Sequence, residues 1–410
     1  MSWAEHAIFW HVYPLGFTGA PPAAEPGEPV VHRLKHLEGW LDYLIELGCN
    51  GLQLGPVFAS STHGYDTVDH FAIDPRLGDD SDFDHLIAAC RERGIRLLLD
   101  GVFNHVGRAF RPAAWFGSAT FEGHDALVVL DHRSEAVREH VITVMNHWLD
   151  RGADGWRLDA AYAVPPDFWR AVLPAVRERH PEAWIVGEVI HGLDYRERAG
   201  LDAVTQYELW KAIWSSLNDR NLFELSWALD RHSPDTLTFV GNHDVTRIAS
   251  RLTNPAHLGH ALAVLFTVAG VPSVYYGDEQ AFRGVKEDRA GGDDAVRPAF
   301  PGSPAELAPF GAEVLRTHQR LIGLRRRFPW LARAETTVAH VTNRQLALRA
   351  EHEGQVVVTL LNLDDAPYQF PAVEPGVVVA ESSPTPDRDR GPYGLGAQAW
   401  RVVTRTVERS

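Results

Sequence analysis

Cysteine is scarce in this sequence. The 410 residues include two cysteines, Cys49 and Cys90. Two thiols cannot build a disulfide framework or a metal site with several cysteine ligands. Cys90 falls on the apolar face of a predicted helix, so we expect a buried thiol at that position.

Basic residues are outnumbered by acidic ones. Lysine and arginine together number 39, aspartate and glutamate number 54, and the formal net charge is −15. Proteins that bind nucleic acids present a basic surface to the phosphates, so this charge excludes a nucleic-acid partner. The same excess of negative charge excludes attachment to an anionic membrane surface.

Long hydrophobic runs are absent as well. No run approaches 18 apolar residues, so we expect no transmembrane helix. The first residues lack the basic and apolar regions of a signal peptide, which predicts a cytoplasmic protein. A secreted protein that had lost its leader would give the same pattern.

Short apolar runs are present instead, and they alternate with segments of helical period. Hydrophobic residues make up 45% of the chain and charged residues 23%, which is typical of a globular protein. Most of the runs are continuously apolar, as in parallel strands that are covered on both faces. The eight runs are 7–13, 51–54, 95–99, 155–158, 184–187, 203–205, 237–240 and 273–276.

The segments between the runs carry apolar residues at helical spacings of three, four and seven. Three such faces are Leu34, Leu37, Leu41, Leu44 and Ile45; Phe83, Leu86, Ile87 and Cys90; and Val137, Val141, Val144 and Trp148. Ser81 and Asp84 have the spacing of a helix capping box. Eight strand–helix units predict a parallel (β/α)8 TIM barrel over residues 1–330.

Three segments depart from this alternation. Residues 104–130 show no clear period and predict a reduced inserted loop after the third strand, and 283–302 predict a surface loop after the eighth. Residues 331–410 predict a small antiparallel, β-sandwich-like domain. Its expected strands are 336–340, 346–350, 356–361, 368–370, 377–380 and 399–403, with turns at 362–365 and 384–389.

Polar residues follow several of the predicted barrel strands. Active sites of these barrels lie at the carboxyl ends of the strands. The sequences at those ends are His63-Gly64-Tyr65-Asp66, Asp100-Gly101-Val102-Phe103-Asn104-His105, Arg157-Leu158-Asp159, Gly187-Glu188 and Gly241-Asn242-His243-Asp244. Clustered carboxylates repel one another, so such a cluster indicates a functional demand rather than a structural one.

Two reactions fit such a cluster. A metal site could use histidine and aspartate ligands from several strands, but the paired His-x-His of barrel metallohydrolases is absent. Glycoside hydrolysis needs one carboxylate as nucleophile or base and one carboxylic acid to protonate the leaving oxygen. Arg157 precedes Asp159 by two residues, so both side chains leave a strand on one face and the cation keeps the carboxylate ionised.

The ordered motifs resemble those of the α-amylase family, glycoside hydrolase family 13. The resemblance runs from about Ile8 to Arg327. Its matching segments are 63–66 with Asp69 and 73–78, 100–105, 155–161, 187–189, 239–244 and 270–279. The resemblance implies that Asp159 is the nucleophile, that Glu188 is the general acid and base, and that Asp244 holds and distorts the sugar.

The same resemblance implies further roles around these acids. Sugar binding or positioning falls to Tyr65, His105, Arg157 and His243. A retaining mechanism implies that the carboxyl groups of Asp159 and Glu188 lie about 5–5.5 Å apart. Supporting roles are expected for Asp100, which would fix Arg157, and for Asp69 and Asp278, which would accept hydrogen bonds that fix loops. Three aromatic residues are expected to be either sugar platforms or packing residues: Trp115, Phe116 and Trp210.

Some positions depart from the family pattern. Calcium-binding amylases take ligands from a longer insert; here Asn104 would be a shared ligand and Asp125 and Asp131 are available, but the usual pattern is not evident. We therefore expect no cofactor, with calcium as the competing hypothesis. The fifth family region survives only in part, at 129–132, and Tyr162-Ala163 stand where many amylases carry lysine and histidine.

The substrate expected from this pattern is an α-1,4-glucan. The sequence predicts a retaining hydrolase of maltooligosaccharides, cyclodextrins or starch-type glucans. The pair Tyr162-Ala163 argues against a long-glucan endo-amylase and leaves room for short or cyclic substrates. A transglycosylase of the same family would share every catalytic residue. Two hypotheses compete with hydrolysis and transglycosylation. One is a non-catalytic sugar-binding relative, and the other is a metal-dependent barrel hydrolase. The sequence does not determine the oligomeric state.

Overall fold

Eight parallel strands form a closed barrel in the computed structural model, which describes residues 2–24, 27, 29–289, 291–373, 376–382 and 391–405. Around the barrel the strand order is β1-β13-β12-β11-β10-β9-β5-β2. These strands are β1 (Phe9–Val12), β2 (Gly51–Leu54), β5 (Arg96–Gly101), β9 (Gly155–Leu158), β10 (Trp184–Gly187), β11 (Ala203–Thr205), β12 (Thr236–Thr238) and β13 (Val271–Tyr275). All eight predicted runs are therefore confirmed as barrel strands, and so is the fold class.

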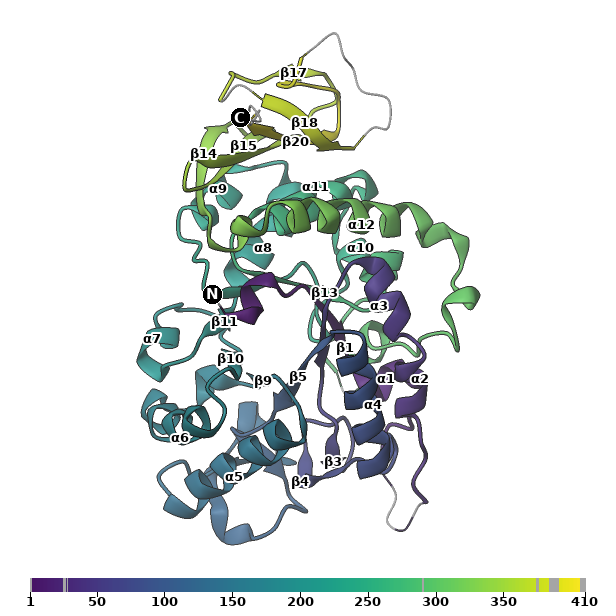
Figure 1. The fold of residues 1–410 in the computed structure, drawn as a ribbon, viewed down its shortest axis with the longest axis vertical. Coiled ribbons are helices and arrows are strands. Elements are labelled where there is room, and N and C mark those ends of the chain that lie inside the picture. Colours follow the sequence, from purple (N-terminus) through teal and green to yellow (C-terminus); the bar gives the residue numbers. More distant parts are fainter. Residues whose placement is uncertain are drawn as a thin grey trace. The chain divides into compact units, whose positions relative to one another are not determined.

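The chain divides into two compact units. One unit comprises residues 9–205 and 297–307, and the other comprises 1–8, 206–296 and 308–410. In the first unit the helices α4, α5 and α6 lie outside the strands β5, β9 and β10 (Figure 1). Its helices are α1 (Pro14–Phe17), α2 (Leu34–Glu38), α3 (Leu41–Leu47), α4 (Asp80–Glu92), α5 (Glu135–Arg151), α6 (Pro166–Arg179) and α7 (Tyr195–Ala199).

The helical faces predicted for α4 and α5 are buried as expected. The first predicted helix differs, because it is broken into α2 and α3, and Ile45 is 42% exposed while the four leucines of that face are buried. The predicted capping box is also wrong by two residues. Asp79 caps α4 by accepting from the backbone of Ser81 and Asp82, and its own N–H donates to the Asp82 carboxylate. Aspartate takes both roles in this box.

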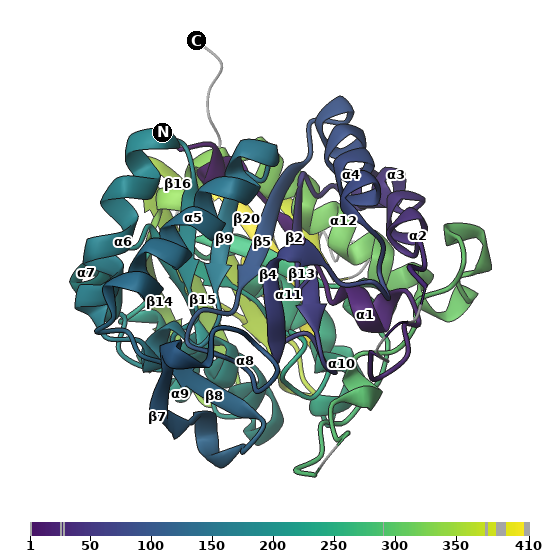
Figure 2. The same cartoon turned by 90° about the horizontal axis from the view of Figure 1, so that it is seen from below.

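The predicted inserted loop contains a small sheet of its own. Strands β6 (His105–Gly107), β7 (Phe116–Thr120) and β8 (Leu127–Leu130) pair in the order β6-β8-β7. Figure 2 labels β7 and β8 side by side. A second pair, β3 (Phe58–Ser60) and β4 (Thr67–Ile73), lies between β2 and α4 in the chain. The insert therefore has backbone hydrogen bonds that fix its shape.

The second unit carries β12 and β13 and the remaining helices. They are α8 (Tyr207–Asp219), α9 (Phe223–Leu229), α10 (Ile248–Arg251), α11 (Leu258–Thr267) and α12 (Ala312–Arg327). Residues 283–289 and 291–302 have almost no regular structure, as predicted, but they are not wholly on the surface. Val296 and Phe300 are buried, each in its own unit. Two apolar side chains within a polar stretch gave no periodic signal.

The C-terminal strands form an antiparallel sheet in the order β14-β15-β16-β20-β18, against which α11 packs through β16 and β20 (Figures 1 and 2). Their bounds are β14 (Glu335–Val341), β15 (Gln345–His352), β16 (Gln355–Asn362), β17 (Tyr368–Gln369), β18 (Gly376–Glu381), β19 (Gly394–Leu395) and β20 (Ala399–Arg405). The six predicted strands are confirmed, and β19, which pairs with β17, was not predicted. The predicted turn at 384–389 lies outside the described residues.

Both cysteines are buried and neither forms a disulfide, as predicted for Cys90. Burial raises the pKa of the Cys90 thiol to about 12. Among the residues that the structure describes, no helix has the length and apolar character needed to cross a bilayer.

Candidate active site

The register of the barrel strands places a buried ion pair at the ends of β5 and β9. Asp100 and Arg157 are direct partners across these two strands. One strand further, Gly187 pairs with Leu158, and the next residue, Glu188, donates its backbone N–H to the Leu158 carbonyl at 2.9 Å. The three strand ends are therefore level, as parallel pairing requires.

Arg157 binds three carboxylates at once. Its Nη1 lies 2.8 Å from Asp100 Oδ1 and 2.7 Å from Asp159 Oδ1, and its Nη2 lies 2.8 Å from Glu188 Oε1. The four side chains are at most 9% exposed. The planar guanidinium fork suits such shared binding, and a lysine could not reproduce it. Asp159 and Glu188 are thereby held on two nitrogens of one group.

The negative charges in this cluster outnumber the positive ones. Burial raises the pKa of Asp100 to about 8; Arg157 opposes this rise, and Asp159 and Glu188 add to it. Burial alone would lower the pKa of Arg157, but the three carboxylates outweigh it and the guanidinium stays charged. Because three acids share one cation, the rise in pKa is a property of the coupled cluster and not of Asp100 alone.

A strained backbone residue adds a donor to the cluster. Ala160 has φ +44° and ψ +37°, in the left-handed region that costs a residue other than glycine about 1 kcal/mol or more. Its backbone N–H donates to Glu188 Oε2 at 2.9 Å. The strain therefore directs a backbone donor toward the second oxygen of Glu188. Single-sequence patterns do not reveal this conformation, because alanine rarely adopts it.

Two predicted sugar-binding residues lie beside these acids. The Tyr65 hydroxyl donates to Asp100 Oδ2 at 3.1 Å, and His105 Nε2 lies 4.0 Å from Asp159 Oδ2. Burial, followed by the charge of His63, lowers the pKa of His105 to about 4, so its imidazole is neutral at pH 7. A neutral imidazole beside a carboxylate is suited to hydrogen bonding with a sugar hydroxyl.

The residues proposed for calcium offer a poor set of oxygen ligands. Asn104 Oδ1 is buried and has no hydrogen-bond partner in the described part of the chain, but its Nδ2 lies 3.1 Å from His105 Nδ1. Asp131 binds Arg133 at 2.9 Å, and Asp125 is exposed. Calcium needs six to eight oxygens. One amide oxygen does not supply that donor set, so these residues do not fit the ion.

His243 and Asp244 lie in the second unit, after β12. His243 Nε2 is 2.9 Å from Asp244 Oδ2, and the backbone N–H of Asp244 donates to Asn242 Oδ1. The Asn242 amide in turn donates to the Tyr207 hydroxyl at 2.8 Å. This chain of contacts fixes the turn that carries the aspartate, within the second unit.

Two of the three supporting aspartates take the places expected of them. Asp100 binds Arg157, as above, and Asp69 Oδ1 accepts from the backbone of Phe71 at 2.8 Å. In the second unit, Asp278 Oδ1 accepts from Arg247 at 2.8 Å, and burial raises the pKa of Asp278 to about 6. The Asp278 contact agrees with the expected role in fixing a loop, whereas the Asp69 contact lies within β4 and fixes no loop.

The three aromatic residues considered as sugar platforms pack against other rings or lie on the insert. Trp115 lies 4.8 Å from the ring of His140, and Trp210 stacks on Phe239 with ring centres 6.4 Å apart. Phe116 begins β7 and is partly exposed. Packing accounts for Trp115 and Trp210.

Two residues near the acids, Phe121 and Glu122, were not found from the sequence, and the contacts of Tyr162 were not predicted. The Tyr162 hydroxyl donates to Glu122 Oε1 at 2.7 Å, and the Phe121 ring stacks on His105 with ring centres 4.3 Å apart. Residues 121 and 122 belong to the insert, where no periodic pattern marked them. Only the replacement of the family lysine and histidine at 162–163 signalled a difference here.

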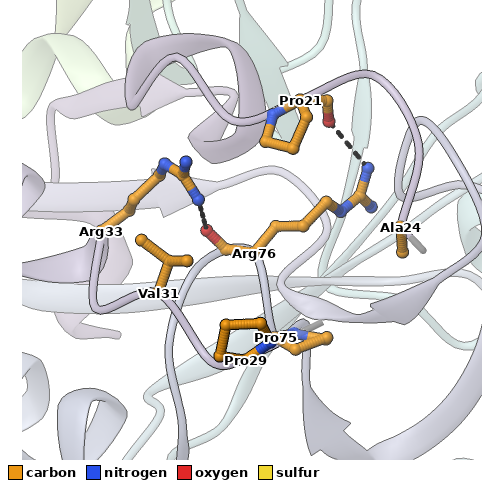
Figure 3. Close-up of a pocket in the computed structure, with 7 residues that line it drawn as sticks. All are labelled: Pro21, Ala24, Pro29, Val31, Arg33, Pro75 and Arg76. Carbon is orange, nitrogen blue, oxygen red and sulfur yellow. Dashed lines mark hydrogen bonds between the residues drawn. The ribbon is translucent and has the colours of Figure 1, made fainter. Parts of the chain in front are cut away.

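A separate cavity of about 180 Å³ lies elsewhere in the first unit (Figure 3). Its described lining consists of Pro21, Ala24, Pro29, Val31, Arg33, Pro75 and Arg76. Arg76 donates to the Pro21 carbonyl at 3.1 Å and Arg33 to the Arg76 carbonyl at 2.8 Å, so both guanidinium groups have partners. No carboxylate or imidazole is among these lining residues, so the cavity lacks the groups of a hydrolytic site.

Known proteins with similar sequences and similar structures exist. Residues 33–126 and 110–301 match the model of the α-amylase catalytic domain. The chain is 29% identical to a cyclomaltodextrinase from a Bacillus species, covering 89% of this chain and 74% of that protein. It is 28% identical to the intracellular maltogenic amylase of Bacillus subtilis strain 168, and the match covers 69% of this chain and 57% of that protein. Among solved structures, the cyclic α-maltosyl-(1→6)-maltose hydrolase of Arthrobacter globiformis is similar, with 25% identity, 99% coverage of both chains and a TM-score of 0.82.

Proposed function

The chain belongs to the α-amylase family of glycosidases, and from this premise we propose that it hydrolyses α-1,4-glucosidic bonds of maltooligosaccharides and cyclodextrins with retention of configuration. The observation that carries the proposal is the shared guanidinium: Arg157 binds Asp159 at 2.7 Å and Glu188 at 2.8 Å. Two carboxyl groups that share one guanidinium supply the nucleophile and the acid that a double displacement requires, and their expected separation of about 5–5.5 Å remains a prediction.

The first step forms a glycosyl–enzyme ester. Asp159 Oδ attacks the anomeric carbon while the bond from that carbon to the glycosidic oxygen breaks. Glu188 gives its proton to the departing oxygen, which leaves as a sugar hydroxyl. Arg157 keeps Asp159 ionised, because a nearby cation favours the carboxylate.

In the second step the two residues exchange their chemical roles: Glu188 acts as a base and Asp159 as the leaving group. Glu188, now ionised, removes a proton from water, and the water oxygen attacks the anomeric carbon. The ester bond to Asp159 breaks, and the carboxylate is regenerated with the sugar in its original configuration. A sugar hydroxyl in place of water would give transglycosylation by the same chemistry.

Further sugar contacts are assigned from the motifs. Asp244 and His243 belong to the fourth family region, and we assign them hydrogen bonds to hydroxyl groups of the sugar that is cleaved. Tyr65 and His105 are assigned contacts with the same sugar, which their positions beside Asp100 and Asp159 support. Hydrogen bonds that strengthen in the transition state would speed the reaction.

The test is product analysis with the purified protein. Starch, maltotriose, cyclodextrin, pullulan and sucrose are incubated with it, with and without an acceptor sugar, and the products are separated by chromatography. The proposal expects glucose or maltose from maltotriose and cyclodextrin, and no turnover by Asp159→Asn. Near-full activity of Asp159→Asn would overturn the assignment of the nucleophile, and transfer products in excess of hydrolysis would favour a transglycosylase.

The place of action is proposed to be the cell interior. The relative from Bacillus subtilis is named an intracellular maltogenic amylase. Short glucans and cyclodextrins must be taken up before such an enzyme meets them. Fractionation of the native host, with activity assayed in the cytosol and the medium, tests this location.

A further inference from the structure

The inserted segment is tied to the loop that follows the proposed nucleophile. Tyr162 and Glu122 are 40 positions apart, yet the Tyr162 hydroxyl donates to Glu122 Oε1 at 2.7 Å. The backbone N–H of Tyr162 donates to the carbonyl of Glu188 at 3.1 Å. One end of this Glu122–Tyr162 bridge is therefore attached directly to the backbone of the proposed acid.

A second contact holds the same part of the insert. The Phe121 ring is stacked on His105, with centroids 4.3 Å apart and an angle of 11° between the planes. His105 in turn lies beside Asp159, with Nε2 4.0 Å from Oδ2. Residues 121 and 122 are thus fixed at two points, one through the ring of His105 beside Asp159 and one through Tyr162, whose backbone is bonded to that of Glu188.

The backbone at Glu122 shows that these contacts hold it in place. Its φ of +49° and ψ of +27° are left-handed, a conformation that a glutamate adopts only when its surroundings impose it. The bridge itself lies at the surface, because Tyr162 is 38% exposed and Glu122 is exposed. A bond that served only to stabilise the core would be buried.

We propose that the Glu122–Tyr162 bridge is a specificity element that closes one side of the catalytic site and favours short or cyclic α-glucans over long chains. The inference rests on the proposed function. The insert follows β5 and Tyr162 follows β9, which are neighbours in the barrel, so the bridge joins the loops of adjacent strands. A long glucan extending past the cleaved bond on this side must displace the bridge, whereas a maltooligosaccharide that ends there does not.

Two substitutions break the bridge without removing a proposed catalytic group. Tyr162→Phe removes the donor and keeps the ring. Glu122→Asn shortens the acceptor and suits a left-handed residue, because asparagine tolerates this conformation. Glu122→Gln keeps an acceptor oxygen at the same reach and is the conservative variant. The matched control is Asp42→Asn. Asp42 lies on α3, and the substitution weakens the exposed bond that it accepts from Arg93.

The readout is the ratio of kcat/KM on amylose to kcat/KM on maltotriose. We expect both bridge-breaking variants to raise this ratio about fivefold to tenfold, as the loss of about 1 kcal/mol of discrimination would do. Glu122→Gln and Asp42→Asn should keep the ratio of the unmodified enzyme. A purely structural bond would change activity on both substrates together and leave the ratio constant.

The outcomes separate this inference from the function on which it rests. An active enzyme whose ratio does not change in Tyr162→Phe and Glu122→Asn overturns the role of the bridge and leaves the hydrolase proposal standing. An unmodified protein that cleaves neither glucan overturns both. Circular dichroism and the Tm establish that each variant folds, and if Tyr162→Phe does not fold, Glu122→Asn alone decides.

Discussion

Arg157 directs a single guanidinium nitrogen, Nη1, at both carboxylate oxygens of Asp100, at 2.8 and 2.9 Å. The two residues are register partners on β5 and β9, and both are buried. This contact leaves Nη2 to bind Glu188. Asp100 therefore orients the arginine without itself being assigned a place on the substrate.

The first prediction concerns this positioning residue. Asp100→Asn removes one of the three carboxyl groups from the cluster and leaves a buried donor of Arg157 with a weaker partner. We expect a lower Tm and a loss of stability on the order of 1–3 kcal/mol. With two carboxyl groups instead of three around the one cation, the remaining acids lose a proton more readily, so the alkaline limb of the pH–rate profile should move to lower pH. An alkaline limb that stays in place would contradict this electrostatic role.

The second prediction separates acid catalysis from nucleophilic attack. Glu188→Gln cannot protonate a leaving oxygen, so hydrolysis of maltotriose should fall on the order of 10²- to 10⁴-fold. An aryl α-maltoside, whose phenolate leaves without protonation, should keep most of the rate of the first step, seen as a burst of phenolate. Glu178→Gln, an exposed residue of α6, is the control. Equal losses on both substrates would argue against the acid role.

The third prediction tests the motif assignment in the second unit. Asp244→Asn keeps the size of the side chain but weakens its hydrogen bonds to sugar hydroxyls. If these bonds strengthen in the transition state, kcat should fall on the order of 10²- to 10³-fold while KM changes less. Asp219→Asn, on the exposed side of α8, should behave like the unmodified enzyme. A changed KM with an intact kcat would indicate ground-state binding only.

The fourth prediction concerns stability in acid. His70 and His140 share a contact of 3.2 Å between their ring nitrogens. Burial lowers the pKa of His70 to about 3, and burial lowers that of His140 to about 4, so both are neutral when folded. The unfolded chain binds their protons below about pH 6.5, so unfolding becomes easier as the pH falls from there toward 4, by about 1.4 kcal/mol per pH unit for each group.

The Tm measured between pH 7 and pH 4.5 checks this dependence. His140→Gln keeps a side chain that can hydrogen-bond to His70 but does not titrate, so its Tm should fall less steeply with acid. Above pH 6.5 the two proteins should show parallel curves. A variant with the same steep fall would assign the acid sensitivity to other groups.

The fifth prediction concerns calcium. Because Asp131 is bound to Arg133 and Asn104 offers a single free oxygen, we expect no dependence on the ion. Activity on maltotriose after dialysis against EDTA should match that of the untreated protein, and added calcium should not raise the Tm. Activity that is lost to EDTA and restored by calcium would reveal a site that these residues do not explain.

Sequence patterns predicted the barrel because each strand left a strong local signal. Continuous apolar runs such as 155–158 and 184–187 mark strands that are covered on both faces. The pairing of Arg157 with Asp159 followed from their spacing of two along one strand. The cap of α4 was missed because Asp79 and Asp82 fill the roles that the sequence pattern gave to Ser81 and Asp84.

Contacts between distant segments left no such signal. The Glu122–Tyr162 bridge joins an aperiodic insert to a short turn, and neither side has a spacing that would predict the other. The left-handed backbone of Ala160 could not be predicted either, because nothing in the sequence distinguishes it from an ordinary alanine. These features depend on tertiary structure that overrides local preference.

The inaccessibility of both thiols has a practical consequence. Cys49 and Cys90 are buried, and the raised pKa of Cys90 keeps it from forming the reactive thiolate. A maleimide dye would therefore label the native protein very slowly. A cysteine introduced at an exposed point of the insert, such as position Ala119, would be the one site that reacts quickly, and the fluorescence of its dye would report how the insert moves when a glucan arrives.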